Sequence, residues 1–473
     1  MADLSVGGLA TGIDTKTLVS QLMALERQPE RILTSRKTKI QSQLDVYNVL
    51  TISLGKLKDL MAGMNTPATF SAKSMAVADS SVLTAQASST AVPGSHTVVV
   101  NSLAKFQRQV SAGGYASVDD LNFNTGTITV SGGTAPLTLT INEGQNSLSG
   151  IAAAINSSGG NLSATIINDG SSAPFRLVIT GKDTSNYTID ATGLATPPAA
   201  PNGAAYANPT FPQSGPTYSA GSLASFSVDG VAITKSSNTI ADVIPGVTLN
   251  LLKEGGSTST VTVSNDTAAV TAKINSFVTS YNDAMGIISK QSAYDTTTNK
   301  GAVLSGDSTI RDLKMALQGI VSSKVAGVSG PFAGLSQLGI STNQKDGTLS
   351  VDSTKLATAL STNFEAVSEL FTRNSKVPNL ASDQYGIAEQ FNLKLEKLTH
   401  AFVGPNSYDN GLISTRINGL NRQITDIDKQ VTRMELLMVQ KEANLNKQFT
   451  AMESLVNSLN GKGNSLLSIL NKM

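Results

Sequence analysis

Few residues of this 473-residue chain could carry bond-breaking chemistry. The sequence holds two histidines, His96 and His400, and no cysteine. A histidine-based triad or a zinc site needs several such side chains close together, and a thiol nucleophile or a disulfide needs cysteine. The Gly-x-Ser-x-Gly, His-Glu-x-x-His and Gly-x-x-x-x-Gly-Lys-Ser/Thr motifs are also absent. The sequence therefore predicts no catalytic, metal-binding or cofactor-binding residues, and we do not expect an enzyme.

Three other stretches have only weak features of binding sites. Gly7, Gly8 and Gly12 precede a predicted helix, but no strand comes before them, so a flexible terminus is favoured over an anion site. Residues 295–301 contain Asp295, yet Thr297 stands where a calcium loop needs a second carboxylate or an Asn, so we expect a turn. A solvated helix face is favoured over an interaction patch for one basic cluster, formed by Arg27, Arg31, Arg36, Lys37 and Lys39.

Composition excludes further classes of protein. The net charge of +1 gives no electrostatic reason to expect nucleic acid or an anionic membrane as partner. No apolar run of about 18 residues is present to cross a bilayer. The first residues lack a basic region followed by an apolar block, so we expect no secretory signal peptide and, for an exported chain, a different export route.

A seven-residue apolar repeat runs through the C-terminal region. Its positions are separated alternately by four and three residues, which is the pattern of a coiled-coil seam, and only Lys441 and Gln448 interrupt it. The positions are Ile413, Ile417, Leu420, Ile424, Ile427, Val431, Met434, Met438, Lys441, Leu445, Gln448, Met452, Leu455 and Leu459. One helix over this repeat would be about 70 Å long at about 1.5 Å per residue. Such a helix needs a partner.

The N-terminal region carries a shorter version of the same pattern. Asp14 can cap a helix that begins at Thr15, and Pro29 interrupts or restarts that helix. The expected apolar face of the first helix contains Leu18, Leu22 and Leu25. The second helix is expected to end near Gly63 and Pro67, and its seam contains Leu33, Lys37, Ile40, Leu44, Tyr47, Thr51, Leu54, Lys58 and Met61, widened by Leu50 and Leu57. Because an isolated amphipathic helix is marginal in water, we expect this region to pair with the C-terminal helix, within one subunit or between several. The alternative is an ordinary helical bundle core.

Between residues 69 and 265 the composition shifts to Ser, Thr, Gly, Ala, Val and Asn with alternating apolar runs, which predicts strands. Residues 137–179 are expected to form one α+β module: a strand (137–141), a helix capped by Ser147, and two strands (161–167 and 175–179). A second, similar module is expected over residues 226–263, with a short turn at 239–244. Proline-rich residues 193–220 are expected to form an exposed loop or linker.

After residue 266 helical spacing returns. The whole order predicts an α+β multidomain chain in which long terminal coiled-coil helices form a leg and nested β-rich head domains are inserted between them. The expected segments are an N-terminal helical leg segment (1–68), a first part of the head domain (69–110), an inserted outer head domain with the proline-rich loop (111–220), a second part of the head domain (221–265), a helical leg body (266–411) and a C-terminal coiled-coil helix (412–473).

Several sequence segments resemble one known family. The stretch GLATGIDT (residues 8–15), running into LVSQLMALE (18–26), is similar to the opening of the bacterial flagellar filament-capping proteins, the hook-associated protein 2 family. Further similar segments are FSAK (70–73), GSHTVVVNSLA (94–104), FVTSYN (277–282), LSGDSTIR (304–311), LGIS (338–341) and DGTL (346–349). The 137–179 module resembles a repeat found in hook-associated proteins and some flagellins.

The resemblance implies a secreted, extracellular, ring-like homo-oligomer at the distal tip of the flagellum. It implies that the terminal helices contact the filament, that flagellin is a partner, and that the protein promotes flagellin folding and insertion. It further implies export by the flagellar type III apparatus with a dedicated chaperone, and it leaves open adhesion to a host surface ligand. The other hypothesis is a secreted coiled-coil fibre or adhesin that displays a β-rich head, and a hydrolase is the least favoured.

Overall fold

The computed structural model describes residues 12, 14–133, 136–199, 203–401 and 410–470. The chain separates into two compact units, a helical unit of residues 1–70 with 267–473 and a β unit of residues 71–266. The finer six-part division expected from the sequence stays a prediction. Among the described residues, no helix is both long and apolar enough to cross a membrane.

The helical unit begins with two helices that local sequence signals delimit. The Asp14 carboxylate accepts from the Thr17 backbone N–H at 3.0 Å and caps the first helix, and Pro29 lies in the first turn of the second. Both predictions are confirmed. The helices of this unit are α1 (Thr15–Glu26), α2 (Gln28–Gly63), α3 (Pro67–Phe70), α5 (Thr267–Ser292), α6 (Ser308–Ser322), α7 (Ser353–Thr362), α8 (Phe364–Thr372), α9 (Ile387–Thr399) and α10 (Leu412–Leu470), with 3-10 turns at Leu335–Leu338 and Ser382–Gln384.

Two short hairpins complete the helical unit: β17 (Tyr294–Asp295) with β18 (Lys300–Gly301), and β19 (Ile340–Thr342) with β20 (Leu349–Val351). The first is the turn expected at residues 295–301, because the Asp295 carboxylate accepts from the Thr297 and Thr298 backbone N–H groups. In the second, Gly347 has a φ of +83°, which a side chain would oppose.

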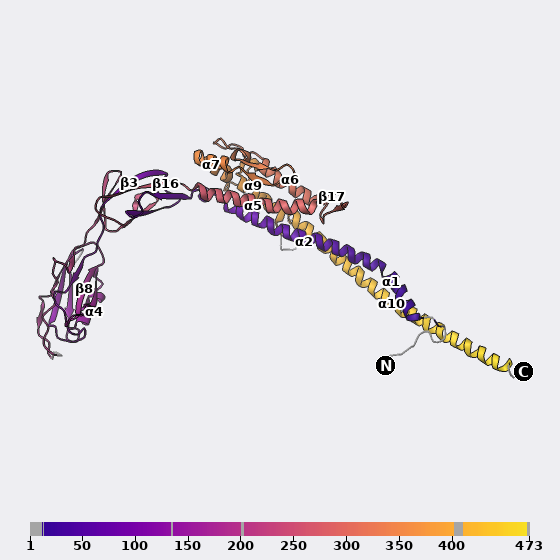
Figure 1. Ribbon diagram of the computed structural model, residues 1–473, viewed down its shortest axis with the longest axis horizontal. Coiled ribbons are helices and arrows are strands. Elements are labelled where there is room, and N and C mark those ends of the chain that lie inside the picture. Colours follow the sequence, from indigo (N-terminus) through magenta and orange to yellow (C-terminus); the bar gives the residue numbers. More distant parts are fainter. Residues whose placement is uncertain (1–11, 13, 134–135, 200–202, 402–409, 471–473) are drawn as a thin grey trace. The chain divides into compact units, whose positions relative to one another are not determined.

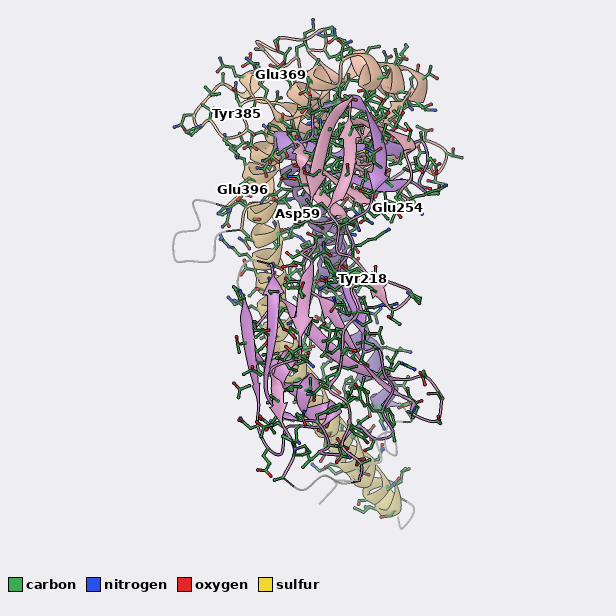
Figure 2. The ribbon with its side chains drawn as sticks, turned by 90° about the vertical axis from the view of Figure 1, so that its left-hand side faces the viewer. Asp59, Tyr218, Glu254, Glu369, Tyr385 and Glu396 are labelled. Carbon is green, nitrogen blue, oxygen red and sulfur yellow. The ribbon has the colours of Figure 1, made fainter. Side chains whose placement is uncertain are left out.

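One apolar core joins the helices of this unit. Tyr47 of α2, Phe277 and Tyr281 of α5 and Phe391 of α9 are fully buried, and the Phe277 and Phe391 rings meet edge to face at 5.4 Å. At the surface of this core Lys58 of α2 pairs with Glu396 of α9, which Figure 2 labels. Within the same unit, α10 lies alongside α2 and α1 (Figure 1).

The β unit consists of antiparallel sheets around two apolar cores. One core lies between a five-stranded sheet of order β1-β16-β3-β12-β13 and a three-stranded sheet of order β14-β15-β2. These strands are β1 (Lys73–Val77), β2 (Leu83–Ala87), β3 (Gly94–Ser102), β12 (Ala224–Val228), β13 (Val231–Lys235), β14 (Thr239–Ile244), β15 (Val247–Leu251) and β16 (Ser257–Asn265).

The second core of the β unit holds helix α4 (Leu148–Ser157) against two four-stranded sheets. In one sheet β5 pairs with β6, β9 and β10, and the other has the order β11-β4-β8-β7. The strands are β4 (Arg108–Val110), β5 (Thr125–Gly132), β6 (Leu137–Ile141), β7 (Leu162–Asn168), β8 (Phe175–Gly181), β9 (Tyr187–Asp190), β10 (Leu194–Thr196) and β11 (Tyr218–Ser219).

The first predicted α+β module is confirmed; the second has strands over residues 226–263 as expected, but its expected turn and its α+β character are wrong. β6, α4, β7 and β8 follow in the expected order, and Ser147 caps α4 by accepting from the Gly150 N–H at 3.0 Å. Residues 239–244, expected as a turn, instead form strand β14, which pairs with β15. The described residues from 224 to 265 therefore contain strands without a helix.

The proline-rich segment is not a wholly exposed linker. Phe211 is buried in the second core of the β unit, and Tyr206 packs against that core. The Tyr206 hydroxyl donates to Asp120 at 2.9 Å, and the Asn208 amide donates to the Leu194 carbonyl at 2.5 Å. These side chains attach the stretch between β10 and β11 to the sheets. The prediction of an exposed loop rested on the prolines and did not take the aromatic residues into account.

Candidate interaction surface

The predicted seam residues of α2 and α10 come together inside one chain. The two helices run antiparallel, and their facing side chains belong to the core of the helical unit. Ile40, Leu44, Tyr47, Leu54, Leu420 and Ile427 are buried in this core, and Leu33, Ile417, Ile424 and Val431 pack against it. Farther along α10, Met438 is buried and Met434, Leu445 and Met452 are half-buried. Since the chain itself covers these side chains, their role toward a second molecule stays a prediction.

Two charged pairs join α10 to α2 and α1. Lys37 of α2 and Asp428 of α10 are 2.5 Å apart, and Lys441 of α10 lies 2.6 Å from Glu26 of α1. Both pairs are partly exposed, so each contributes little to stability. Their positions nevertheless show that α10 runs antiparallel to α1 and α2, because the later residue Lys37 pairs with the earlier residue Asp428 and Glu26 pairs with Lys441.

A more deeply buried polar cluster joins α2, α6 and α10. The Arg416 guanidinium of α10 donates to the Asp307 carboxylate at 2.9 Å, and that carboxylate also caps α6 by accepting from the Thr309 N–H at 2.9 Å. Burial alone would raise the pKa of Asp307, but the Tyr47 hydroxyl and Arg416 beside it hold that pKa below its ordinary value. Burial, followed by the nearby Asp307 charge, raises the pKa of Tyr47 well above its ordinary range. Asp307 is therefore an ionised, paired group at neutral pH.

Helix α1 faces α10 with a different side from the one expected. Val19 and Met23 are buried against Met438, with Met434, Leu445 and Phe449 packed around them. Leu18, Leu22 and Leu25 lie on the exposed side of α1 and do not take part in that contact. Any interaction that they make must involve another surface, and their role in interaction stays a prediction.

The last third of α10 is mostly exposed. Beyond Phe449 the partly buried apolar positions are Met452 and Val456, whereas Leu455 and Leu459 of the expected seam are exposed. The exposed large apolar side chains of this helix are Leu412, Leu436, Leu437, Val439, Leu455, Leu459, Leu466, Leu467 and Ile469. Single exposed leucines are ordinary, but this many on one helix is typical of a surface that another molecule covers.

The two histidines form isolated surface pairs. His96 Nδ1 lies 2.8 Å from the Asp229 carboxylate, and His400 Nδ1 lies 2.9 Å from Glu396 one turn earlier on its helix. Within the part of the chain that the structure describes, no group of three His, Cys, Asp or Glu side chains could hold a metal ion. The features with functional potential are thus apolar helix surfaces.

Comparison with known proteins identifies the family. A model of the flagellar hook-associated protein 2 C-terminus matches residues 221–461, and a model of the N-terminus of the same protein matches residues 11–107. The chain belongs to the flagellar hook-associated protein 2 family. The resemblance of the short sequence segments is thereby confirmed.

Relatives in this hook-associated protein 2 family align over nearly the whole chain. The B-type flagellar hook-associated protein 2 of Pseudomonas aeruginosa is 27% identical over 98% of this chain and 97% of its own length. The Escherichia coli flagellar hook-associated protein 2 is 26% identical over 98% of each chain. The crystal structure of the D1-D2-D3 domains of the E. coli flagellar cap protein FliD has a TM-score of 0.55 and 25% identity, covering 80% of this chain and 99% of that chain.

Proposed function

We propose that this protein caps the distal end of the bacterial flagellar filament and promotes the folding and insertion of flagellin subunits during growth. The support is membership of the hook-associated protein 2 family together with similarity to a protein described as the flagellar cap. This membership favours capping over the alternative of a secreted fibre or adhesin. The protein would act outside the cell as a ring-like homo-oligomer, and its work would require no covalent chemistry.

The single observation that carries a mechanism is the exposed apolar surface of α10. Leu455, Leu459, Leu466 and Leu467 lie beyond the segment that α1 covers, on a helix of 59 residues. Such a helix can pair with helices of a second molecule, as coiled-coil legs do. The proposed partner is flagellin at the filament end, which each leg would hold through contacts weak enough to exchange when a new subunit enters.

Export through the flagellar type III apparatus with a dedicated chaperone, and adhesion to a host ligand, remain expectations from the family resemblance. A cysteine-free chain suits export in an unfolded state, because it cannot form premature disulfides. No described feature points to a particular host ligand.

The direct test is complementation of a strain that lacks its own filament cap. Expression of this full chain is expected to restore long filaments, with immunogold label against the chain at their distal ends in electron micrographs. Label spread along the filament, or equally long filaments without the chain, would refute the proposal.

A further inference from the structure

A second apolar stripe runs along the outer face of α1 and the start of α2. Its positions Leu18, Leu22, Leu25, Pro29 and Ile32 are separated alternately by four and three residues, and all five are exposed. Leu25 and Ile32 are the most exposed, at 62% and 69%. The same spacing continues to Arg36 and Lys39, which are exposed basic residues. We call these seven positions the outer stripe.

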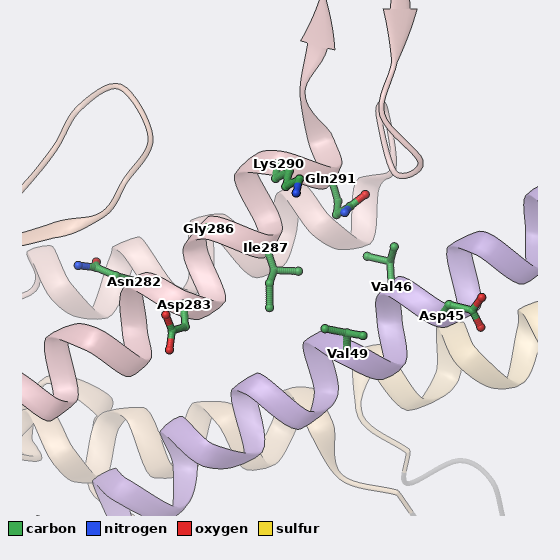
Figure 3. A pocket seen from close by; sticks show the side chains of 9 residues that line it. All are labelled: Asp45, Val46, Val49, Asn282, Asp283, Gly286, Ile287, Lys290 and Gln291. Atoms are coloured by element: carbon green, nitrogen blue, oxygen red, sulfur yellow. The ribbon is translucent and has the colours of Figure 1, made fainter.

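A groove of about 580 Å³ lies elsewhere on the same unit, between α2 and α5. Val46 and Val49 of α2 and Ile287 of α5 form its apolar lining, and Gly286 leaves room between the helices because it has no side chain. Val49 is 53% exposed and extends from α2 toward the side of Ile287 (Figure 3). Asp283 and Asp45 lie at opposite ends of this apolar lining (Figure 3), and Lys290 is a basic residue among those that line the groove.

We infer that the groove between α2 and α5 receives the outer stripe of a second copy of this chain. Ile32 of the stripe matches the apolar lining, and the basic end of the stripe, Arg36 and Lys39, complements the Asp283 carboxylate at one end of the groove. With Ile32 in the groove, Arg36 follows one helical turn later, about 6 Å along the axis. This spacing brings the Arg36 guanidinium to the end of the groove while the Ile32 side chain fills its apolar part. The inference rests on the proposed homo-oligomeric cap.

The geometry of this contact leads to a ring. Stripe and groove are different surfaces of one chain, so each copy offers its stripe to one neighbour and its groove to the other. Such head-to-tail contacts close into rings when the rotation permits. Because the contact uses one groove and a few side chains of the stripe, it would be weak and exchangeable on its own.

The absence of cysteine makes a clean cross-linking test possible. Full-length chain with Ile32→Cys and Val49→Cys is used to restore filaments in the cap-deficient strain, and isolated filaments are oxidised. Both positions lie on α2, 17 residues or about 25 Å apart, so a disulfide between them must join two copies. We expect disulfide-linked oligomers that disappear on reduction. The matched control is Ile32→Cys with Ile52→Cys, because Ile52 is 62% exposed on α2 but does not line the groove.

Restored filaments that yield no more cross-linked oligomer than the control would overturn this interface while leaving the capping proposal intact. Failure of the unmodified chain to restore filaments would instead refute capping. If the cysteine variants alone fail to restore filaments, the self-association of the purified full chain is measured at increasing protein concentration. There, Asp283→Lys should weaken self-association about two- to fivefold. Adding Arg36→Glu and Lys39→Glu should restore it, and no restoration would contradict the inference.

Discussion

At the scale of single residues, the most informative group is Asp307. Its carboxylate serves two helices at once, capping α6 and pairing with Arg416 of α10, and only 5% of its side chain is exposed. Asp307 is not among the residues that the sequence pattern singles out for a site. Its position before a helix indicates a cap, but nothing local indicates a partner 109 residues away. The ion pair between Asp307 and Arg416 lies where α2, α6 and α10 meet. We expect this pair to fix the position of α10 on α2.

Replacing Asp307 with Asn removes the charge and keeps an oxygen able to cap α6. We expect the free energy of unfolding to fall by about 2 kcal/mol at pH 7, since a hydrogen bond to a charged group is lost. Because the pKa of Asp307 is lowered in the folded state, its contribution is present above the ordinary carboxyl range and is lost as pH falls through the lowered pKa. The difference between wild type and variant should therefore shrink below about pH 4.

Urea unfolding followed by circular dichroism at several pH values measures this difference. Asp59 provides the control, because it is an exposed carboxylate on helix α2 (Figure 2), and Asp59→Asn should change stability by less than about 0.5 kcal/mol. A destabilisation by Asp307→Asn that persists unchanged at pH 3 would contradict the assigned ionisation.

At the scale of elements, local signals predicted much of the fold. The spacing of apolar residues, the helix caps and the turn residues predict α2 and the β6-α4-β7-β8 module, because each of these signals depends on residues only a few positions apart. The expected turn at residues 239–244 became β14 because it pairs with β15, where its buried residues Ile240 and Ile244 lie on either side of a register shift.

Two details of the helix surfaces could not be predicted from spacing. On α1, Leu18 and Leu22 have the same spacing as Val19 and Met23, so the pattern alone does not select the face that meets α10. Contact with Met438 and its neighbours on α10 buries Val19 and Met23, and the spacing along α1 carries no information about those distant partners. Beyond Phe449 a straight helix drifts by about 20° per heptad relative to a strict seven-residue repeat, so Leu455 and Leu459 lie away from the continued stripe.

The packing of α10 on α2 leads to a direct stability prediction. Leu420 is 1% exposed in this contact, and Leu420→Ala should lower the free energy of unfolding by about 2–5 kcal/mol through lost burial and a cavity. On the same helix Leu437 is 60% exposed, and Leu437→Ala should cost less than about 0.5 kcal/mol. Equal shifts of the urea midpoint for the two variants would show that α10 does not pack as described.

At the scale of the whole molecule, the chain combines a helical unit built from both ends of the sequence with a β unit inserted between them. The N-terminal half of α10 belongs to the core of the helical unit, through Ile413, Leu420 and Ile427. Deleting the entire helix would therefore damage the fold as well as any interaction. Substitutions confined to the exposed end of α10 separate the two effects.

The most direct measurement is filament length in the cap-deficient strain that expresses full chain with Leu455, Leu459, Leu466 and Leu467 replaced by Gln. Gln is a good helix former, so helix content and export of the variant should match wild type. A control with Gln at Ser454, Asn457, Ser458 and Asn464 changes the same segment without removing apolar surface. The account predicts that the leucine variant leaves filaments short or absent while the control restores them. Filaments of wild-type length from the leucine variant would contradict it.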